Sequence, residues 1–206
     1  EHLLDNEIIW RKRELAQIKS TIRASKATKL DFLIRAGIAL LYAHWEGFIK
    51  AAGTHYLNYI ASKKLTYNEV TSNIIAISMK TKLDEAKKTN KATVYSQVSD
   101  FFLSGLSARC SIPWNDAIDT QSNLSSIVFR EIIYILGLDF RDYETKSTII
   151  DDKLLARRNK IAHGELLPVE INEYLSLHDE VLNMMELFRN QISNAASTES
   201  YRRRTD

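Results

Sequence analysis

The chain has 206 residues, of which 45% are hydrophobic, and this suits one domain with a sizeable core. Its 28 Lys and Arg against 26 Asp and Glu leave a net charge of +2. Bulk charge therefore indicates neither nucleic acid nor a membrane surface as partner, and any anion site must come from a local cluster. Cys110 stands alone, which excludes an intrachain disulfide and favours a reducing compartment, the cytoplasm.

The start of the chain shows no signal peptide, and no apolar run approaches the roughly 20 residues that a membrane span needs. We therefore expect no membrane contact. The first residue is Glu1 rather than Met, so we expect a few native residues to precede it.

Helical periodicity dominates the first half of the chain. Leu4, Ile8, Leu15, Ile18 and Ile22 recur at helical spacing near the N-terminus. The segment LDFLIRAGIALLYAHWEGFIKAAGTHYLNYIA that follows is apolar on most of its circumference, which is typical of a helix in the centre of a bundle. Two further helices are predicted over residues 66–88 and 92–104, divided by the basic stretch KKTNK.

The second half begins with an irregular stretch, residues 105–121, in which IPWND indicates a turn. Ser122 or Asn123 can cap a helix that runs to Gly137. The sequence TIID, residues 148–151, has the form of a capping box and predicts the start of the next helix.

That next helix carries LLARRNKIAHGE, and Gly164 fits the position just after its end. Pro168 fits the first turn of a final helix that runs to about Asn194. We expect a single all-α bundle with long central helices over residues 1–195, and a polar, disordered tail over residues 196–206.

The run LLARRNKIAHGE holds the candidate site. Asn159 and His163 are four residues apart and share one helix face, whereas Arg158 and His163 are five apart and point away from each other on an ideal helix. The long Arg stem and the freedom of Gly164 can bring the two together. A guanidinium beside an imidazole makes a plausible phosphate site, since Arg offers a fork of donors and His moves protons near neutral pH.

A purely structural explanation of the same run stays open at this point. Arg and Lys near a helix C-terminus complement the helix dipole, and one His beside a Gly is ordinary.

The segment ARRNKIAHGE resembles the signature of the HEPN superfamily, in which an Arg, followed by a polar residue, precedes a His at a spacing of Arg-x4-6-His. Here Arg158, Asn159 and His163 match, and the pair Arg157 and His163 satisfies the looser spacing. Two more segments, LLYAHWEGFIKAAGTHYLNYI and IDTQSNLSSIVFREIIYILGLD, are similar to the bacterial HEPN-like nucleases of the MAE type, and the three come in that family's order.

The resemblance implies a helical bundle that pairs as a C₂ homodimer. It also implies a metal-independent endoribonuclease of a toxin–antitoxin or phage-defence system, acting on single-stranded RNA without a cofactor. Arg158 would bind the scissile phosphate, His163 would serve as general acid or base, and Asn159 would orient either group. Arg157 would add phosphate contact. Where some of these toxins have a Tyr two residues after the His, this chain has Glu165, so silencing through that Tyr is not expected.

Glu46 is a supporting candidate, because it interrupts an apolar helix in which an unpaired carboxylate is costly. It shares a stripe with Arg35, Tyr42 and Lys50. One interpretation is an ion pair with Lys50 that faces water. The other is an ion pair that holds Arg158 or His163 in position.

Other polar residues receive plainer interpretations. His44 and His55 share a face with apolar neighbours, and we expect them in the core or in an interface; with no carboxylate at ligand spacing, no metal site is expected. Lys87, Lys88 and Lys91 are candidates for RNA contact, with a solvated face as the alternative.

Two functional classes remain open. The first is the ribonuclease, which would leave a 2′,3′-cyclic phosphate and a 5′-hydroxyl, with an antitoxin or companion defence protein as possible partner. The second is a non-catalytic HEPN module that binds RNA or a partner protein. The presence of Arg158, Asn159 and His163 together favours the first, since binding alone has no chemical need for all three.

Overall fold

The computed structural model describes residues 2–204, and every regular element in them is a helix. Within this range only two isolated β-bridges occur, Thr66 with Arg109 and Val70 with Arg202. The predicted all-α class is therefore confirmed.

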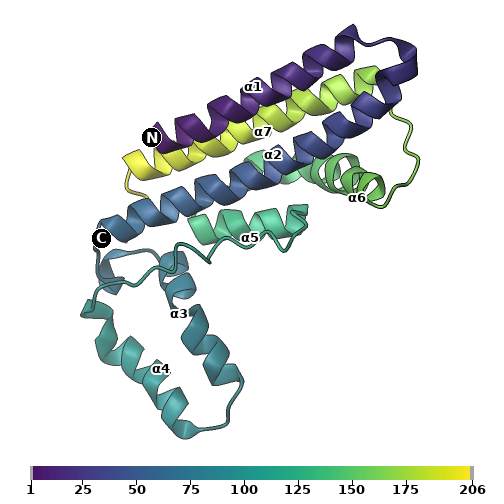
Figure 1. The fold of residues 1–206 in the computed structure, drawn as a ribbon. Helices are drawn as coiled ribbons and strands as arrows, with labels where there is room; N and C mark the ends of the chain where they lie inside the picture. The colour runs from purple at the N-terminus through teal and green to yellow at the C-terminus, as the bar shows by residue number, and fades with distance from the viewer. Residues whose placement is uncertain (1, 205–206) are drawn as a thin grey trace.

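Three long helices form the body of the molecule. They are α1 (His2–Ala24), α2 (Ala27–Ser62) and α7 (Ile171–Ser197), and they run side by side in Figure 1. The α2 helix contacts both of the others and also α5 and α6, so it is the central helix that its apolar circumference predicts. Trp45 and Phe48 of α2 are fully buried and meet Phe129 and Phe188 edge to face, which anchors the core.

A helical hairpin projects from one end of this body (Figure 1). It consists of α3 (Ser72–Lys87) and α4 (Ala92–Ser104), with short 3₁₀ turns at its base, η1 (Tyr67–Glu69) and η2 (Gly105–Ser107). The basic stretch predicted to divide the two helices forms the tip of the hairpin.

The helix α5 (Ser126–Leu136) starts later than predicted. Gln121 and Ser122 have φ of 53° and 58°, a left-handed conformation that cannot enter a helix. The N-cap is Ser125, whose hydroxyl accepts a hydrogen bond from the Val128 N–H at 3.3 Å. The end of α5 is as predicted, because Gly137 takes the left-handed conformation with φ 67°.

The predicted capping box at Thr148 is wrong. Thr148 already has helical angles, φ −60° and ψ −36°, because the 3₁₀ turn η3 (Arg141–Lys146) leads almost directly into the π-helix η4 (Ile149–Ala156) and on into α6 (Arg157–Ala162). Asp151 instead reaches across to the start of α5, where its carboxylate accepts the Ser126 N–H at 2.7 Å and the Ser126 hydroxyl. Asp151, which was expected to cap the helix that contains it, instead caps the start of α5.

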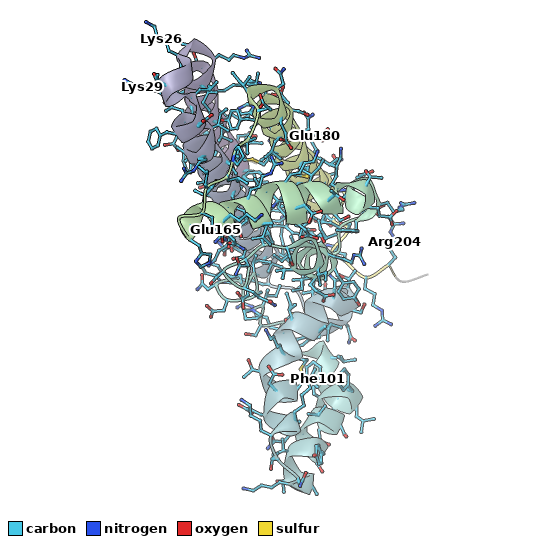
Figure 2. All side chains as sticks on the ribbon, turned by 90° about the vertical axis from the view of Figure 1, so that its right-hand side faces the viewer. Lys26, Lys29, Phe101, Glu165, Glu180 and Arg204 are labelled. Atoms are coloured by element: carbon cyan, nitrogen blue, oxygen red, sulfur yellow. The ribbon has the colours of Figure 1, made fainter. Side chains whose placement is uncertain are left out.

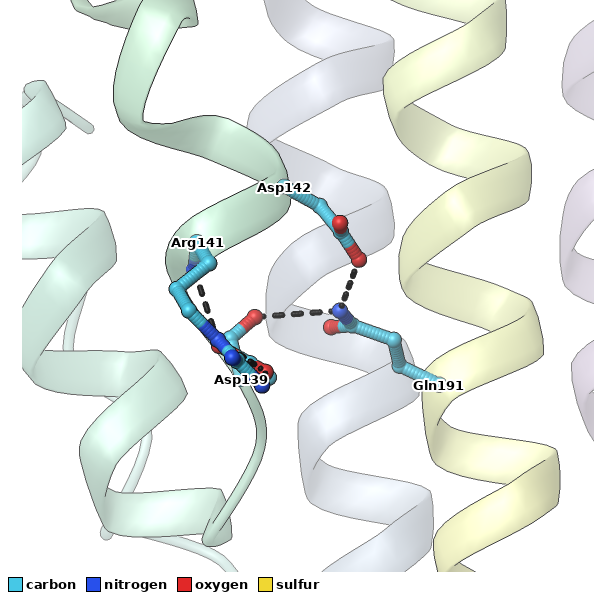
Figure 3. Close-up of polar contacts among 4 residues, drawn as sticks. All are labelled: Asp139, Arg141, Asp142 and Gln191. Atoms are coloured by element: carbon cyan, nitrogen blue, oxygen red, sulfur yellow. Dashed lines mark hydrogen bonds and ion pairs between the residues drawn. The ribbon is translucent and has the colours of Figure 1, made fainter.

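The position predicted for Pro168 is also wrong. The first residue of α7 is Ile171, its N-cap is Glu170, and Pro168 lies before it in the extended connection from α6. Toward its end α7 is tied to η3: the Gln191 side-chain amide donates to the Asp139 carbonyl at 3.0 Å and to the Asp142 carboxylate at 3.1 Å (Figure 3).

The expected tail is packed against the base of the hairpin as far as Arg203, so the expectation of a disordered segment does not fit residues 196–203. Tyr201 is buried, and its carbonyl accepts the Thr71 N–H at 2.9 Å. The Arg203 N–H binds the Glu69 carbonyl at 2.9 Å. Tyr201 is the one aromatic residue in this polar tail, and its burial holds the tail against the body, which the polar composition of the tail did not indicate. Residues 205 and 206 lie outside the described residues.

The expectation on apolar runs needs a correction as well. Residues 28–62, in α2, are long and apolar enough by length and composition to cross a membrane, with a mean hydropathy of 1.2 in the best window. Half of that window is buried inside the bundle, and the core helix of a helical bundle passes the same test.

Candidate functional site

The run that holds the candidate motif lies on α6 and its end. A π-helical turn precedes it directly, a feature that recurs near functional sites. Gly164 ends the helix with φ 76°, as predicted. The Gly164 N–H binds the Ile161 carbonyl and the Glu165 N–H binds the Lys160 carbonyl, the paired bonds of a Schellman motif. This turn fixes where His163 leaves the helix.

Arg158 of α6 is held by groups from two other segments, α2 and the loop before α5. Its guanidinium lies over the Tyr42 ring at 4.0 Å from the ring centroid, a cation–π contact. One guanidinium nitrogen, Nη2, donates to the Ser122 carbonyl at 3.1 Å and to the Asn123 side-chain oxygen at 3.2 Å. No carboxylate of the described chain lies within ion-pair distance, and the buried Nε has no hydrogen-bond partner there. Arg158 therefore keeps both an uncompensated charge and a free donor, which suits an anionic ligand.

Tyr42 organises this arrangement. Its side chain is buried, and its hydroxyl accepts the Leu124 N–H at 2.8 Å, which ties α2 to the loop that holds Arg158. Burial raises the pKa of the Tyr42 phenol above its ordinary 10.0; the Glu46 carboxylate adds to the rise, while the Leu124 N–H and Arg158 oppose it. Tyr42 thus keeps its proton near neutral pH.

An open groove of about 490 Å³ lies over these residues. Most of its wall is small and apolar, with three alanines and one isoleucine. Its polar lining consists of Tyr42, Glu46, Ser122 and Arg158. The groove therefore offers one cation, one carboxylate and two hydroxyls on an apolar floor.

Glu46 is half-buried in the wall of this groove. It forms neither of the ion pairs considered from the sequence, since no partner among Lys50, Arg158 and His163 lies within 4.0 Å in the described chain. It lies close enough to the Tyr42 hydroxyl to raise the pKa of that phenol. Since a carboxylate can accept several hydrogen bonds, Glu46 can receive a donor from a ligand beside Tyr42.

His163 stands apart from this groove. Its side chain is exposed, has no hydrogen-bond or ion-pair partner in residues 2–204, and is not part of the groove lining. Asn159 is half-buried and likewise lies outside the lining. Within one chain the structure therefore does not bring Arg158 and His163 together, as the five-residue spacing indicates for a regular helix.

Arg157 points to a different neighbour. It forms an ion pair with Glu173 near the start of α7, and its side chain is largely buried. Its contacts tie α6 to the bundle, and Arg158 alone of the two arginines enters the groove.

The candidate lysines lie at the tip of the hairpin. Lys87, Lys88 and Lys91 are exposed, and Lys87 pairs loosely with Asp84 at 3.7 Å. The tip is remote from α6 in Figure 1, and Figure 2 shows the hairpin, marked by Phe101, extending away from the part of the body where Glu165 lies.

The two histidines of α2 lie against α1. His44 is buried, with its Nε2 at 2.8 Å from the Glu14 carboxylate and its ring edge to face with Trp10. His55 is half-buried and lies 4.0 Å from Glu7. In the part of the chain that the structure describes, no group of three or more His, Cys, Asp or Glu could hold a metal ion.

Sequence reasoning missed Tyr42, Ser122 and Asn123 as site residues. Tyr42 was visible as a member of the stripe with Glu46, and that stripe is a usable signal. The loop residues carry no comparable signal, because their contact with Arg158 depends on the tertiary fold.

Together these features define an all-α bundle with an unpaired arginine at an open groove. A family model of MAE-like HEPN domains matches residues 1–201, so the chain belongs to this HEPN family. No curated protein and no solved structure shows a significant match to the chain.

Proposed function

We propose that this protein is an endoribonuclease that cleaves single-stranded RNA through the 2′-hydroxyl, without a metal ion. HEPN domains are commonly ribonucleases, and the chain belongs to a HEPN family. In the proposed reaction Arg158 binds the scissile phosphate and stabilises the charge that develops on it. His163 transfers a proton, and Asn159 orients His163 or the phosphate by hydrogen bonds.

The observation that carries this proposal is the state of Arg158. Its guanidinium is fixed by Tyr42, Ser122 and Asn123, has no acidic partner in the described chain, and faces an open groove. Fixing a cation without neutralising it costs free energy unless an anion binds there. An RNA phosphate is an anion that such a guanidinium fork binds well.

The position of His163 supports a site that two copies of the chain complete. Arg158 faces the groove while His163 is exposed and without a partner in the described residues, so one chain offers only half of the catalytic set. In a C₂ dimer the same surface of each copy meets the other, and His163 of one copy can approach Arg158 of the second. We therefore also propose that the protein acts as a homodimer.

The test is RNA cleavage in excess EDTA with purified protein. The proposal predicts cleavage that persists, products that end in 2′,3′-cyclic phosphate and 5′-hydroxyl groups, and loss of both in Arg158→Ala. Loss of all cleavage in EDTA, or products with 5′-phosphates, would contradict the mechanism.

The biological setting proposed is the cytoplasm of a bacterial cell, in a toxin–antitoxin or phage-defence system with an antitoxin or companion protein as partner. The lone Cys110, which is buried, is compatible with a reducing compartment. If the protein binds RNA tightly and cuts none, the non-catalytic RNA-binding module replaces the enzyme as the better account.

A further inference from the structure

The groove contains a carboxylate that the proposed function leaves without a task. Glu46 lines the same groove as Arg158, on the adjacent helix α2, while His163 does not. Both Glu46 and Arg158 lie close enough to the Tyr42 hydroxyl to influence it, one raising and the other lowering its pKa. The two charged groups are nevertheless more than 4.0 Å apart, since they form no ion pair.

A space between a guanidinium and a carboxylate on a shared wall suits a ligand that carries an anion and a hydrogen-bond donor side by side. A ribonucleotide within RNA has this pair in its 3′-phosphate and the 2′-hydroxyl on the neighbouring carbon. The phosphate would bind Arg158, and the hydroxyl would donate to Glu46. The small side chains of Ala39, Ala43 and Ala162 leave the room that a ribose needs.

From this geometry we infer that Glu46 is a catalytic residue, which accepts the 2′-hydroxyl of the nucleotide whose 3′-phosphate binds Arg158 and takes its proton during cleavage. This assignment rests on the proposed ribonuclease function. It goes beyond the supporting role expected from the sequence, in which Glu46 would hold Arg158 or His163 through an ion pair.

The proton balance assigns the remaining step to His163. Glu46 removes the proton from the 2′-oxygen, which attacks phosphorus and forms the new oxygen–phosphorus bond. The bond from phosphorus to the 5′-oxygen breaks, and the imidazolium of His163 gives this leaving oxygen its proton. The products are the cyclic phosphate and a 5′-hydroxyl, and Glu46 and His163 then return to their starting states by exchange with water.

Tyr42 has a positioning part in this arrangement. It retains its phenolic proton because burial raises its pKa, so its hydroxyl can donate to the Glu46 carboxylate while it accepts the Leu124 N–H. Arg158 limits the repulsion between the carboxylate and the incoming phosphate, since its positive charge lies near both.

Two substitutions separate contact from chemistry. Glu46→Gln keeps an oxygen that can accept the 2′-hydroxyl but cannot take its proton, so cleavage should fall by about a hundredfold or more while RNA affinity stays within a few-fold. Glu46→Leu removes the acceptor as well. Asp31→Asn, an exposed carboxylate of the same helix, is the matched control and should cleave as the wild type does.

The contact itself is measured by equilibrium binding, which needs no cleavage. Two labelled strands are compared: a single-stranded RNA, and the same strand with 2′-fluorine in place of each 2′-hydroxyl. Each is titrated with the His163→Ala protein, so that the RNA stays intact. With Glu46 present the hydroxyl strand should bind about tenfold more tightly. A double variant that combines His163→Ala with Glu46→Leu should lose that preference. A double variant that combines His163→Ala with Glu46→Gln should largely keep it.

The outcomes distinguish this assignment from the function on which it rests. Wild-type cleavage with an equally active Glu46→Gln would overturn the assignment and leave the ribonuclease intact. A wild type that cuts nothing, yet prefers the hydroxyl strand through Glu46, would overturn the ribonuclease and support the contact. Equal binding of the two strands whatever residue 46 is would overturn the contact.

Discussion

Two adjacent arginines have different surroundings, and this difference is the clearest residue-scale feature of the site. Arg158 lies over Tyr42 at the groove, whereas Arg157 pairs with Glu173 and ties α6 to α7. Arg158→Lys keeps the charge but loses the planar fork and the stacking, so we expect RNA cleavage to fall by about a hundredfold or more. Initial rates on a single-stranded RNA measure it.

Arg157→Lys is the matched control for that substitution. Its ammonium can still reach Glu173, so cleavage should stay within a few-fold of the wild type. If RNA cleavage falls equally in the two variants, the contact of Arg158 with the groove does not set it apart from Arg157, and its assignment as the phosphate-binding residue is wrong.

His44 gives the folded chain a predictable pH dependence. Burial lowers the pKa of His44 below its ordinary 6.5, partly offset by the nearby Glu14. Below that value the unfolded chain binds a proton that the folded chain resists, so stability is full above pH 6.5 and falls as the pH drops through and below it. The urea midpoint should therefore fall between about pH 7.5 and about pH 5.5, and His44→Gln should reduce this fall. If the urea midpoint of His44→Gln falls with decreasing pH as steeply as that of the wild type, a group other than His44 causes the loss of stability in acid.

At the scale of elements, the start of α5 and the groove depend on Asp151. Its carboxylate binds the N–H and hydroxyl of Ser126, directly after the loop that holds Arg158. Asp151→Ala leaves a buried serine without its acceptor and removes a favourable charge from the helix N-terminus, so we expect a loss of about 1–3 kcal/mol in unfolding free energy. Urea unfolding measures it.

Asp152→Ala is the neighbouring control, because Asp152 is exposed and should change stability by less than about 0.5 kcal/mol. A stability loss of the same size in both variants would contradict the capping role of Asp151.

Most helices could be predicted from the sequence, since their apolar residues recur at helical spacing and glycines mark two of their ends. The capping box at Thr148 and the position of Pro168 could not be predicted correctly. The residues at Thr148 suit a helix start, but the chain there is already helical. Pro168 suits a first helical turn, but the helix begins only at Ile171. Local sequence describes which residues can begin a helix, and tertiary packing decides which of them do.

The candidate site could be predicted only in part for a related reason. Arg158 and His163 are recognisable as a local motif, but the partners of Arg158 come from α2 and the loop before α5. Glu46 was visible as a carboxylate in an apolar helix, and only the fold shows that it lines the groove instead of forming an ion pair. Contacts between distant segments leave no spacing pattern in the chain.

At the scale of the whole molecule, the proposed active site needs two copies of the chain. The protein should therefore run in solution as a dimer of about twice its mass of 23.7 kDa. Light scattering coupled to gel filtration measures this mass. A strictly monomeric protein that still cleaves RNA would contradict the shared site.

The central claim is that Arg158 of one copy works with His163 of the other. Arg158→Ala and His163→Ala should each fold, form dimers and cleave no RNA. When the two variants are mixed and allowed to exchange subunits, each mixed dimer holds one intact Arg158 and one intact His163 on different chains. The account predicts that cleavage returns in proportion to the mixed dimer, measured by native mass spectrometry alongside the RNA assay. A mixture that contains the mixed dimer and remains inactive would contradict it.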